Sequence, residues 1–183
     1  MIYKTIITDA TIRDINDAHK VVHRTMHAPD EHKPCPPFMV IGDGMLLVQS
    51  SYKPLVKNAI VSEVNLDNMD TVKLRVRVAA VRRDPTTKRE KPIMANGRVD
   101  IPFIRDWVIR RFAEFGLTPN EKDPTVRYGG RIGDAHHNMK NCPVVDIEGV
   151  WKVSDKELLE KLLVTKLGRR NFLGLGMIRL VNN

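Results

Sequence analysis

Apolar and polar residues follow two different periods along the chain, and their order predicts a set of elements. Residues 2–8 are rich in Ile, Tyr and Thr and predict a strand. From Arg13 to His27, apolar residues recur at steps of three and four, which predicts an amphipathic helix. Two apolar runs then flank the turn at Gly42-Asp43-Gly44, which is typical of a hairpin. Residues 54–56 predict one or two helical turns, and residues 59–64 predict another strand.

The same order of elements returns in the second part of the chain. Residues 72–80 alternate between apolar and basic side chains, which predicts a strand with one basic face. Residues 82–98 are polar and predict a mobile hairpin or loop, and Pro102 opens a helix whose buried stripe runs from Ile104 to Phe115. The remaining expected elements are an edge strand over 126–132, a polar loop over 133–141, a strand over 144–151, a helix opened by a capping box at Ser154 to Glu157, and a last strand over 175–181.

Two consecutive βαββαβ units predict an α+β fold made of two tandem ferredoxin-like (RRM-like) domains. We place the N-terminal domain over residues 1–69 and the C-terminal domain over residues 70–183. This fold supports many unrelated functions, so the function has to come from particular residues.

Composition excludes several classes of protein. The chain has 183 residues, of which 42% are hydrophobic, and this is enough for a packed core. No apolar run approaches the ~18 residues of a membrane helix, and the opening residues do not form a signal peptide. Two distant cysteines, Cys35 and Cys142, make neither a disulfide framework nor a metal-binding knuckle. We therefore expect a reduced, cytoplasmic protein.

Charge is distributed unevenly between the two predicted domains. The whole chain carries a formal net charge of +8. Residues 1–69 hold 7 basic and 8 acidic side chains, a net charge of −1, whereas residues 70–183 hold 23 and 14, a net charge of +9. A basic domain beside a near-neutral one favours a surface that binds a polyanion. The alternative is a solvated surface that keeps the protein soluble.

A segment rich in glycine and basic residues joins the last predicted helix to the last strand. It contains Gly168, Gly174 and Gly176, with Lys166, Arg169 and Arg170 among them. Glycines allow backbone N–H groups to approach a phosphate closely, and the basic side chains add charge. Glycine is also what a tight turn from helix to strand requires, so the segment alone does not decide between the two roles.

Several stretches, taken in order, resemble one family. They are Met1 to Thr8 with Arg13-Asp14 and His19, Leu47-Val48-Gln49-Ser50, Leu74 to Ala79 followed by Pro102, Ile147-Glu148-Gly149-Val150, and Gly168 to Gly176 leading into a final apolar strand. Together they cover nearly the whole chain and resemble the CasE subfamily (type I-E) of the CRISPR repeat-RNA processing endoribonucleases. The family is built from two ferredoxin-like domains, in agreement with the division above.

The resemblance implies an activity and partners. It implies an endoribonuclease without metal or cofactor that cuts CRISPR precursor RNA within each repeat, at the base of a hairpin, to mature the crRNA. In that reaction the ribose 2′-OH attacks the adjacent phosphorus and leaves a 2′,3′-cyclic phosphate and a 5′-OH. It also implies that the protein stays on the product hairpin as a subunit of a Cascade surveillance complex.

Three histidines lie four residues apart on the first predicted helix. At ~100° per residue the apolar stripe centres between Ile15 and Ala18, so His19 lies at its edge, His23 lies further round and His27 points most nearly to water. Imidazole suits the proton transfers of the implied reaction. The resemblance identifies His19 as the catalytic acid or base, with His23 as the alternate. His32, His136 and His137 are expected in surface loops.

Two other roles for the helix histidines remain open from the residues themselves. A histidine at the edge of an apolar stripe is often a partly buried structural residue. A pair spaced i, i+4 can also bind zinc, but no Glu accompanies it in an HExxH arrangement, so we expect no metal.

The sequence departs from the family at the expected site. Family members often carry tyrosine three residues before the catalytic histidine, where this chain has Asn16. A glycine and a lysine expected in the terminal loop are replaced by Lys166 and Asn171. An amide can hydrogen-bond a phosphate but cannot replace a phenol as an acid. Compensation is expected from nearby cations: Lys20, Arg24, Lys166, Arg169 and Arg170.

The expected RNA surface is basic, because an RNA stem is recognised mainly through its shape and phosphates. Its candidate residues are Lys20, Arg24, Lys73, Arg75, Arg77, Arg82, Arg83, Lys88, Arg89, Arg98, Arg105, Arg110, Arg111, Lys166, Arg169 and Arg170. Two other functions fit the same fold. One is a catalytically weak or inactive protein that binds the RNA hairpin, and the other is a small structural interaction protein, which leaves the charge of +9 unexplained.

Overall fold

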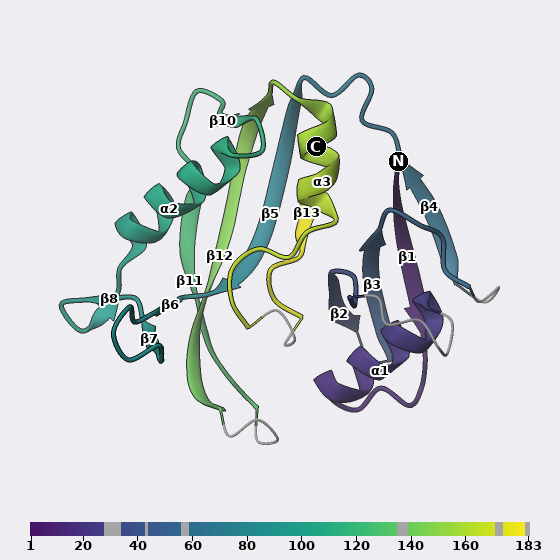
Figure 1. Cartoon of the computed structure of the whole chain (residues 1–183), viewed down its shortest axis with the longest axis horizontal. Coiled ribbons are helices and arrows are strands. Elements are labelled where there is room, and N and C mark those ends of the chain that lie inside the picture. The colour runs from purple at the N-terminus through teal and green to yellow at the C-terminus, as the bar shows by residue number, and fades with distance from the viewer. Residues whose placement is uncertain (28–33, 43, 56–58, 135–138, 171–173, 182–183) are drawn as a thin grey trace.

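The computed structural model describes residues 1–27, 34–42, 44–55, 59–134, 139–170 and 174–181, with the backbone alone at residues 134, 139 and 140. Two antiparallel sheets stand side by side, and helices lie against each of them (Figure 1). The connection from the first sheet to the second contains the expected division at residues 69 and 70.

The first sheet consists of β1 (Ile2–Thr8), β2 (Phe38–Gly42), β3 (Met45–Ser50) and β4 (Ile60–Val64). Its spatial order is β2-β3-β1-β4, and all neighbouring strands are antiparallel. Helix α1 (Ile15–Met26) covers one face of this sheet. The helix residues Ala18, Val21 and Val22 pack there against Leu46 and Val48 of β3. This is the strand order of a ferredoxin-like domain.

The second sheet repeats this order, with two long strands in its centre and short strands at its edges. It is formed by β10 (Leu117–Pro119), β12 (Met139–Val153), β5 (Thr71–Ala79) and β13 (Ile178–Leu180), and β11 (Thr125–Asp134) also pairs with β12. Helices α2 (Ile101–Ala113) and α3 (Lys156–Leu163) supply the two crossovers. The predicted α+β fold of two ferredoxin-like units is therefore confirmed by the topology of both sheets.

The core of the second unit follows from the alternation along β5. Leu74, Val76 and Val78 point to the helices and are almost fully buried. The ring of Phe112 on α2 lies 4.6 Å from that of Trp151 on β12, measured between ring centroids. Two residues of the first unit also belong to this core. Ile2 of β1 and Leu66, which follows β4, lie in the same buried cluster as the residues of β5. The two units therefore share apolar contacts.

Several predicted elements are wrong in detail. Between β3 and β4, the described residues 51–55 and 59 contain no helix, so the expected second helix of the first unit is not found there. The hairpin or loop expected over 82–98 forms two short hairpin ladders, β6 (Val81–Arg83) with β7 (Glu90–Pro92) and β8 (Met94–Ala95) with β9 (Arg98–Val99), so the hairpin alternative is the one the structure shows. An antiparallel strand can keep one face in water, so polar residues can belong to a strand. The alternation of apolar and polar residues therefore does not show where such a strand begins or ends.

The end of the chain differs in a similar way. Strands β11 and β12 continue well into the expected polar loop over 133–141, and their pairing reaches Asp134 and Met139. The last strand is shorter than the predicted 175–181, because ladder pairing with β5 covers residues 178–180 only. Among the described residues, no helix is long and apolar enough to cross a membrane.

The start of α3 is set by Asp155 and not by the predicted capping box at Ser154. The Asp155 carboxylate accepts the N–H of Leu158 at 2.9 Å, whereas the Ser154 hydroxyl donates to the carbonyl oxygen of Gly116 at 2.8 Å. Helix α3 thus begins one residue later than expected, and Glu157 is too early in the helix to bond back to the cap.

This start of α3 leads to a stability prediction. Asp155→Ala is expected to lower the free energy of unfolding by about 1 kcal/mol, because the Leu158 N–H loses its acceptor. Glu157→Ala is the matched control and is expected to cost roughly 0.3 kcal/mol through the helix dipole alone. Urea unfolding of both variants measures the two changes in the free energy of unfolding. Equal losses would contradict the assignment of Asp155 as the cap and favour the capping box predicted from the sequence.

Candidate active site

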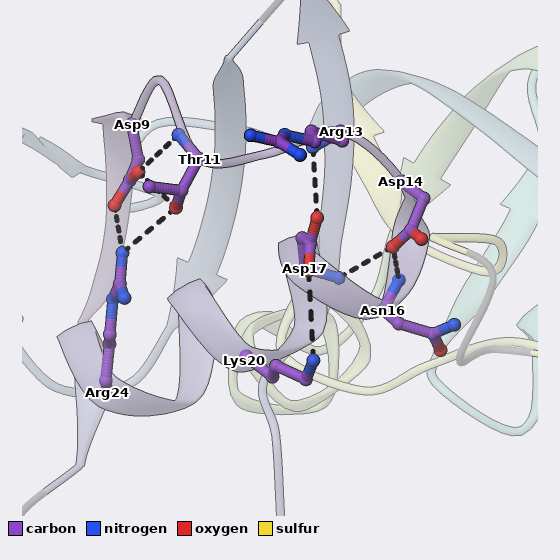
Figure 2. A network of polar contacts seen from close by, with 8 residues as sticks. All are labelled: Asp9, Thr11, Arg13, Asp14, Asn16, Asp17, Lys20 and Arg24. Atoms are coloured by element: carbon purple, nitrogen blue, oxygen red, sulfur yellow. Dashed lines mark hydrogen bonds and ion pairs between the residues drawn. The ribbon is translucent and has the colours of Figure 1, made fainter.

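The first turn of α1 is held by a set of backbone and side-chain contacts that Figure 2 shows. The carboxylate of Asp14 accepts the backbone N–H groups of Asn16 at 2.8 Å and Asp17 at 2.9 Å, which is the usual work of a helix N-cap. Asp17 in turn accepts the N–H of Arg13 at 3.3 Å and pairs with Lys20 at 3.8 Å. The turn that precedes His19 is therefore fixed in place.

His19 lies on α1 where the helix meets β2. Its imidazole contacts the ring of Phe38 edge-on, with 6.1 Å between centroids and 73° between the ring planes. The side chain is half-buried, as expected for the edge of the apolar stripe. Asn16 lies three residues earlier and is also half-buried, and its side-chain amide points away from the capping contacts (Figure 2).

The glycine-rich segment of the second unit reaches this place on the first unit. The Nζ atom of Lys166 lies 5.9 Å from the centroid of the Phe38 ring, the same ring that His19 contacts. Further along the segment, Gly174 lies against Ile15 of α1 and the backbone of Phe38, where an added Cβ would come within 3.4 Å of the Ile15 side chain. His19 and Lys166, predicted separately, are thus brought together around Phe38.

The electrostatics of this pair favour a neutral imidazole beside a cation. Partial burial lowers the pKa of His19 below its usual 6.5, and the positive charges of Lys166 and then His23 lower it further. Burial also lowers the pKa of the Lys166 ammonium, and the nearby Cys35 thiol works in the opposite direction. At neutral pH, His19 is therefore mostly unprotonated and ready to accept a proton, with a positive charge alongside.

The other two helix histidines are placed differently. His23 is half-exposed and its ring lies 4.8 Å from the ring of His27. His27 is buried with 2% of its surface exposed, and its ring nitrogens lie 3.4 and 3.5 Å from the Tyr52 hydroxyl. The prediction that His27 points to water is wrong, because His27 is the C-cap with extended backbone, so the helical angle no longer applies to it. His32, His136 and His137 lie outside the described residues.

The two cations on α1 are engaged in local ion pairs. Arg24 pairs with Asp9 and lies 3.5 Å from the Thr11 hydroxyl, and Lys20 pairs with Asp17 (Figure 2). Neither pair is buried, so an incoming phosphate can compete with it.

The basic face of β5 is matched by acidic residues on the neighbouring strand. Lys73 and Arg75 pair with Glu148 at 3.0 and 2.8 Å, and Arg77 pairs with Asp146 at 2.8 Å. The hydrogen bonds from Lys73 and Arg75 lower the pKa of the Glu148 carboxyl. These cations line an open cleft of about 990 Å³ with Arg179 and with Met39 of the first unit, and neither His19 nor Lys166 lines that cleft. The sequence did not show this pairing, because it depends on the register of β5 and β12.

The remaining predicted RNA contacts cluster on the short ladders, on α2 and in the glycine-rich segment. Arg82, Arg83 and Arg98 are exposed on the ladders, and Lys88 and Arg89 are exposed in the connection between β6 and β7. On α2, Arg110 is exposed, Arg111 pairs with Glu114, and Arg105 is half-buried.

Arg169 and Arg170 are not free side chains. Both contact the carboxylate of Glu90 on β7, Arg169 at 3.4 Å and Arg170 through its Nε. Nothing in the sequence singles out Glu90. Its ion pairs join the glycine-rich segment to the β6–β7 ladder, and only the structure shows this contact.

The glycines of the segment have the backbone that glycine favours. Gly168, Gly174 and Gly176 have φ angles of +80°, +70° and +79°, a region that L side chains rarely adopt. Asn171 lies outside the described residues. Over the part of the chain that the structure describes, no three metal-ligating side chains form a cluster.

Two residues of the site carried weak or no signals in the sequence. Phe38 was visible only as an apolar residue of a strand. Gln49 is a polar residue after the apolar run Leu46-Leu47-Val48, and it is buried with 1% exposed. A buried polar residue usually has hydrogen-bond partners, so such a break in an apolar strand was a usable signal.

The fold resembles that of several solved structures along its whole length. Cse3 of Thermus thermophilus, bound to an RNA representing a pre-cleavage complex, has a TM-score of 0.73 at 18% identity, with 99% of each chain covered. The CRISPR-associated protein Cas6e from Escherichia coli K-12 has a TM-score of 0.66 at 20% identity, with 98% of each chain covered. A chain of E. coli Cascade bound to a PAM-containing dsDNA target has a TM-score of 0.52 at 18% identity and covers 97% of this chain and 96% of its own.

At these identities the similarity establishes the shared fold. No known family model matches the sequence, and no curated protein matches it at a significant level.

The geometry around Phe38 gives a prediction for the free protein. Lys166→Met keeps the length of the side chain but removes its charge, so the pKa of His19 is expected to rise, while burial still keeps it below 6.5. Titration of the histidine ring protons by NMR measures this shift. Lys20→Met is the control. If both substitutions change the pKa of His19 equally, the charge of Lys166 has no specific effect on His19 and the prediction is wrong.

Proposed function

We propose that this chain is an endoribonuclease that cuts CRISPR precursor RNA within the repeat, at the base of its hairpin. The observation that carries the proposal is the meeting of His19 and Lys166 around Phe38, a proton acceptor and a cation brought together from the two units. The full-length similarity in fold to Cse3, solved with a pre-cleavage RNA, and to Cas6e supports this choice among the many functions of the ferredoxin-like fold.

In the proposed reaction, His19 takes the proton of the ribose 2′-OH, and the oxygen attacks the adjacent phosphorus. The bond from phosphorus to the 5′ oxygen breaks, and that oxygen leaves as a hydroxyl after receiving a proton. The products are a 2′,3′-cyclic phosphate and a 5′-OH end. Lys166 stabilises the negative charge that grows on the phosphate oxygens, and its lowered pKa also fits it to supply the proton to the leaving oxygen.

The hairpin is proposed to bind over the basic side of the second unit. The exposed cations of the ladders and α2, together with the glycine-rich segment, form a surface that phosphates of an RNA stem fit. By similarity to the chain within E. coli Cascade, we further propose that the protein remains on the product hairpin inside such a complex.

A second candidate function is favoured by Asn16. Its amide occupies the position where the resembling family often has tyrosine, and an amide supplies no proton to a leaving group. A protein that holds the hairpin without cutting it would keep every other feature described above.

The proposal predicts the effect of removing the imidazole. His19→Ala is expected to lower the cleavage rate by roughly 10²–10⁴-fold, the usual contribution of a general acid or base. Affinity for the uncut hairpin is expected to change little, because it comes mainly from distant Lys and Arg contacts. Single-turnover cleavage of the repeat RNA in EDTA and gel-shift binding measure the two quantities.

His23→Ala is the matched control, one turn along the same helix, and is expected to be far milder. Normal cleavage by His19→Ala, or loss of cleavage in His23→Ala alone, would contradict the assignment. If the wild type binds the hairpin but never cuts it, the second function holds, and Asn16→Tyr is then the variant in which cleavage is expected to appear.

The binding surface gives a separate prediction. Reversing Arg82 and Arg83 to Glu is expected to weaken hairpin binding strongly and to reduce the slope of affinity against salt concentration by about two, one for each lost phosphate contact. Reversing Lys53 and Lys57 of the first unit changes the charge equally and is expected to have a small effect. Hairpin affinity is measured for both double variants at several salt concentrations. Equal losses of affinity would contradict the placement of the RNA-binding surface on the second unit.

A further inference from the structure

Gln49 is a buried side chain of the first unit whose hydrogen bonds go to the second unit. It lies in β3 on the face of the first sheet opposite α1, since its neighbour Val48 packs under that helix. The Nε2 atom donates to the carbonyl oxygens of Leu163 and Ile178, each at 2.8 Å. The two hydrogens of one amide nitrogen are thus shared between two distant points of the chain.

These two carbonyl groups mark the base of the glycine-rich segment. Leu163 is the last residue of α3, and Ile178 is the first residue of β13. Between them the segment is closed by its own backbone contacts, with a bridge between Lys166 and Met177 and a hydrogen bond of 2.9 Å from the Leu167 N–H to the Gly176 oxygen. The amide of Gln49 therefore fastens both stems of the segment at the level where it begins.

The carbonyl groups at the end of α3 show why this bond is needed. The last four carbonyl oxygens of a helix have no partner within it. Those of Glu160 and Leu162 accept the N–H groups of Val164 and Thr165, and that of Lys161 accepts the Thr165 hydroxyl at 2.6 Å. The oxygen of Leu163 is bonded by Gln49. The first unit thus completes the helix end of the second.

Lys166 follows the fastened residue Leu163 by three positions. Only a short stretch of backbone, closed by the bridge between Lys166 and Met177, separates Lys166 from the residue that Gln49 bonds. At the other side of the segment, Gly174 contacts Ile15 of α1. A loss of the amide would leave two buried carbonyl oxygens without a donor and release the base of the segment. Apolar contacts with Ile2 and Leu66 also reach this part of the second unit, whereas the hydrogen bonds to the two stems come from Gln49.

We propose that Gln49 is a positioning residue that holds Lys166 beside His19. It acts through the backbone of the glycine-rich segment and does not itself reach the reacting groups. The inference rests on the proposed cleavage reaction for its functional meaning, but the placement it describes exists in the free protein.

The test combines three variants in a double-mutant cycle. Gln49→Leu keeps the size of the side chain and removes both donated hydrogen bonds. Its cleavage rate is expected to fall by roughly 10²-fold, the scale of a small misplacement at a reacting centre, while hairpin affinity stays within about threefold. In a Lys166→Met background, the same substitution is expected to add less than about twofold to the loss, because the residue acts through Lys166.

NMR titration gives a readout that a purely structural role would not move. In free Gln49→Leu, the pKa of His19 is expected to rise as far as it does in Lys166→Met. Thr5→Val is the matched control, since Thr5 is fully buried in the neighbouring strand on the α1 face and its hydroxyl has no partner in the described part of the chain. It is expected to leave both the His19 pKa and the cleavage rate unchanged.

The outcomes separate this inference from the proposed function. A folded Gln49→Leu with an unchanged His19 pKa, or losses that add fully in the cycle, overturns the inference even if the wild type cleaves. If the wild type does not cleave, the titration still decides the inference. Should Gln49→Leu not fold, Gln49→Asn serves instead, because its shorter amide cannot span both carbonyl oxygens, and an unchanged His19 pKa in that variant has the same meaning.

Discussion

The contact between the two units includes one buried side-chain amide whose nitrogen bonds two backbone carbonyl oxygens across it. This amide, that of Gln49, serves the end of a helix and the start of a strand at once. Because the donors come from one unit and the acceptors from the other, the packing of the units has little freedom. The same packing brings both His19 and Lys166 to the ring of Phe38.

The sequence predicted the order of most elements because their periods differ clearly. The helices α1 and α2 have regular apolar stripes, and the alternation along β5 separates a basic face from an apolar one. The lack of a helix in the described residues 51–55 and 59, and the pairing of the short strands over 81–99, were not predictable in this way. Short elements there take their form from partners distant in sequence, such as the bond from the Ile93 N–H to the Ala80 oxygen.

The candidate site was predictable in part for similar reasons. The helical angle placed His19 correctly at the edge of a stripe, because it lies well inside α1. The same rule failed for His27, which lies where the helix ends and the backbone turns back into the core. Ion pairs such as those of Arg77 with Asp146 and Arg170 with Glu90 join strands and loops tens of residues apart, so no local pattern contains them.

Ile2, Val64 and Leu66 come from the first unit yet pack into the core of the second. Cutting the chain at the connection would expose these side chains on one piece and leave a void in the other. We therefore expect thermal denaturation to be a single cooperative transition of the whole chain. A chimera that exchanges one unit for that of a distant relative has to carry these three positions with it, so the seam for recombination does not coincide with the connection between the sheets.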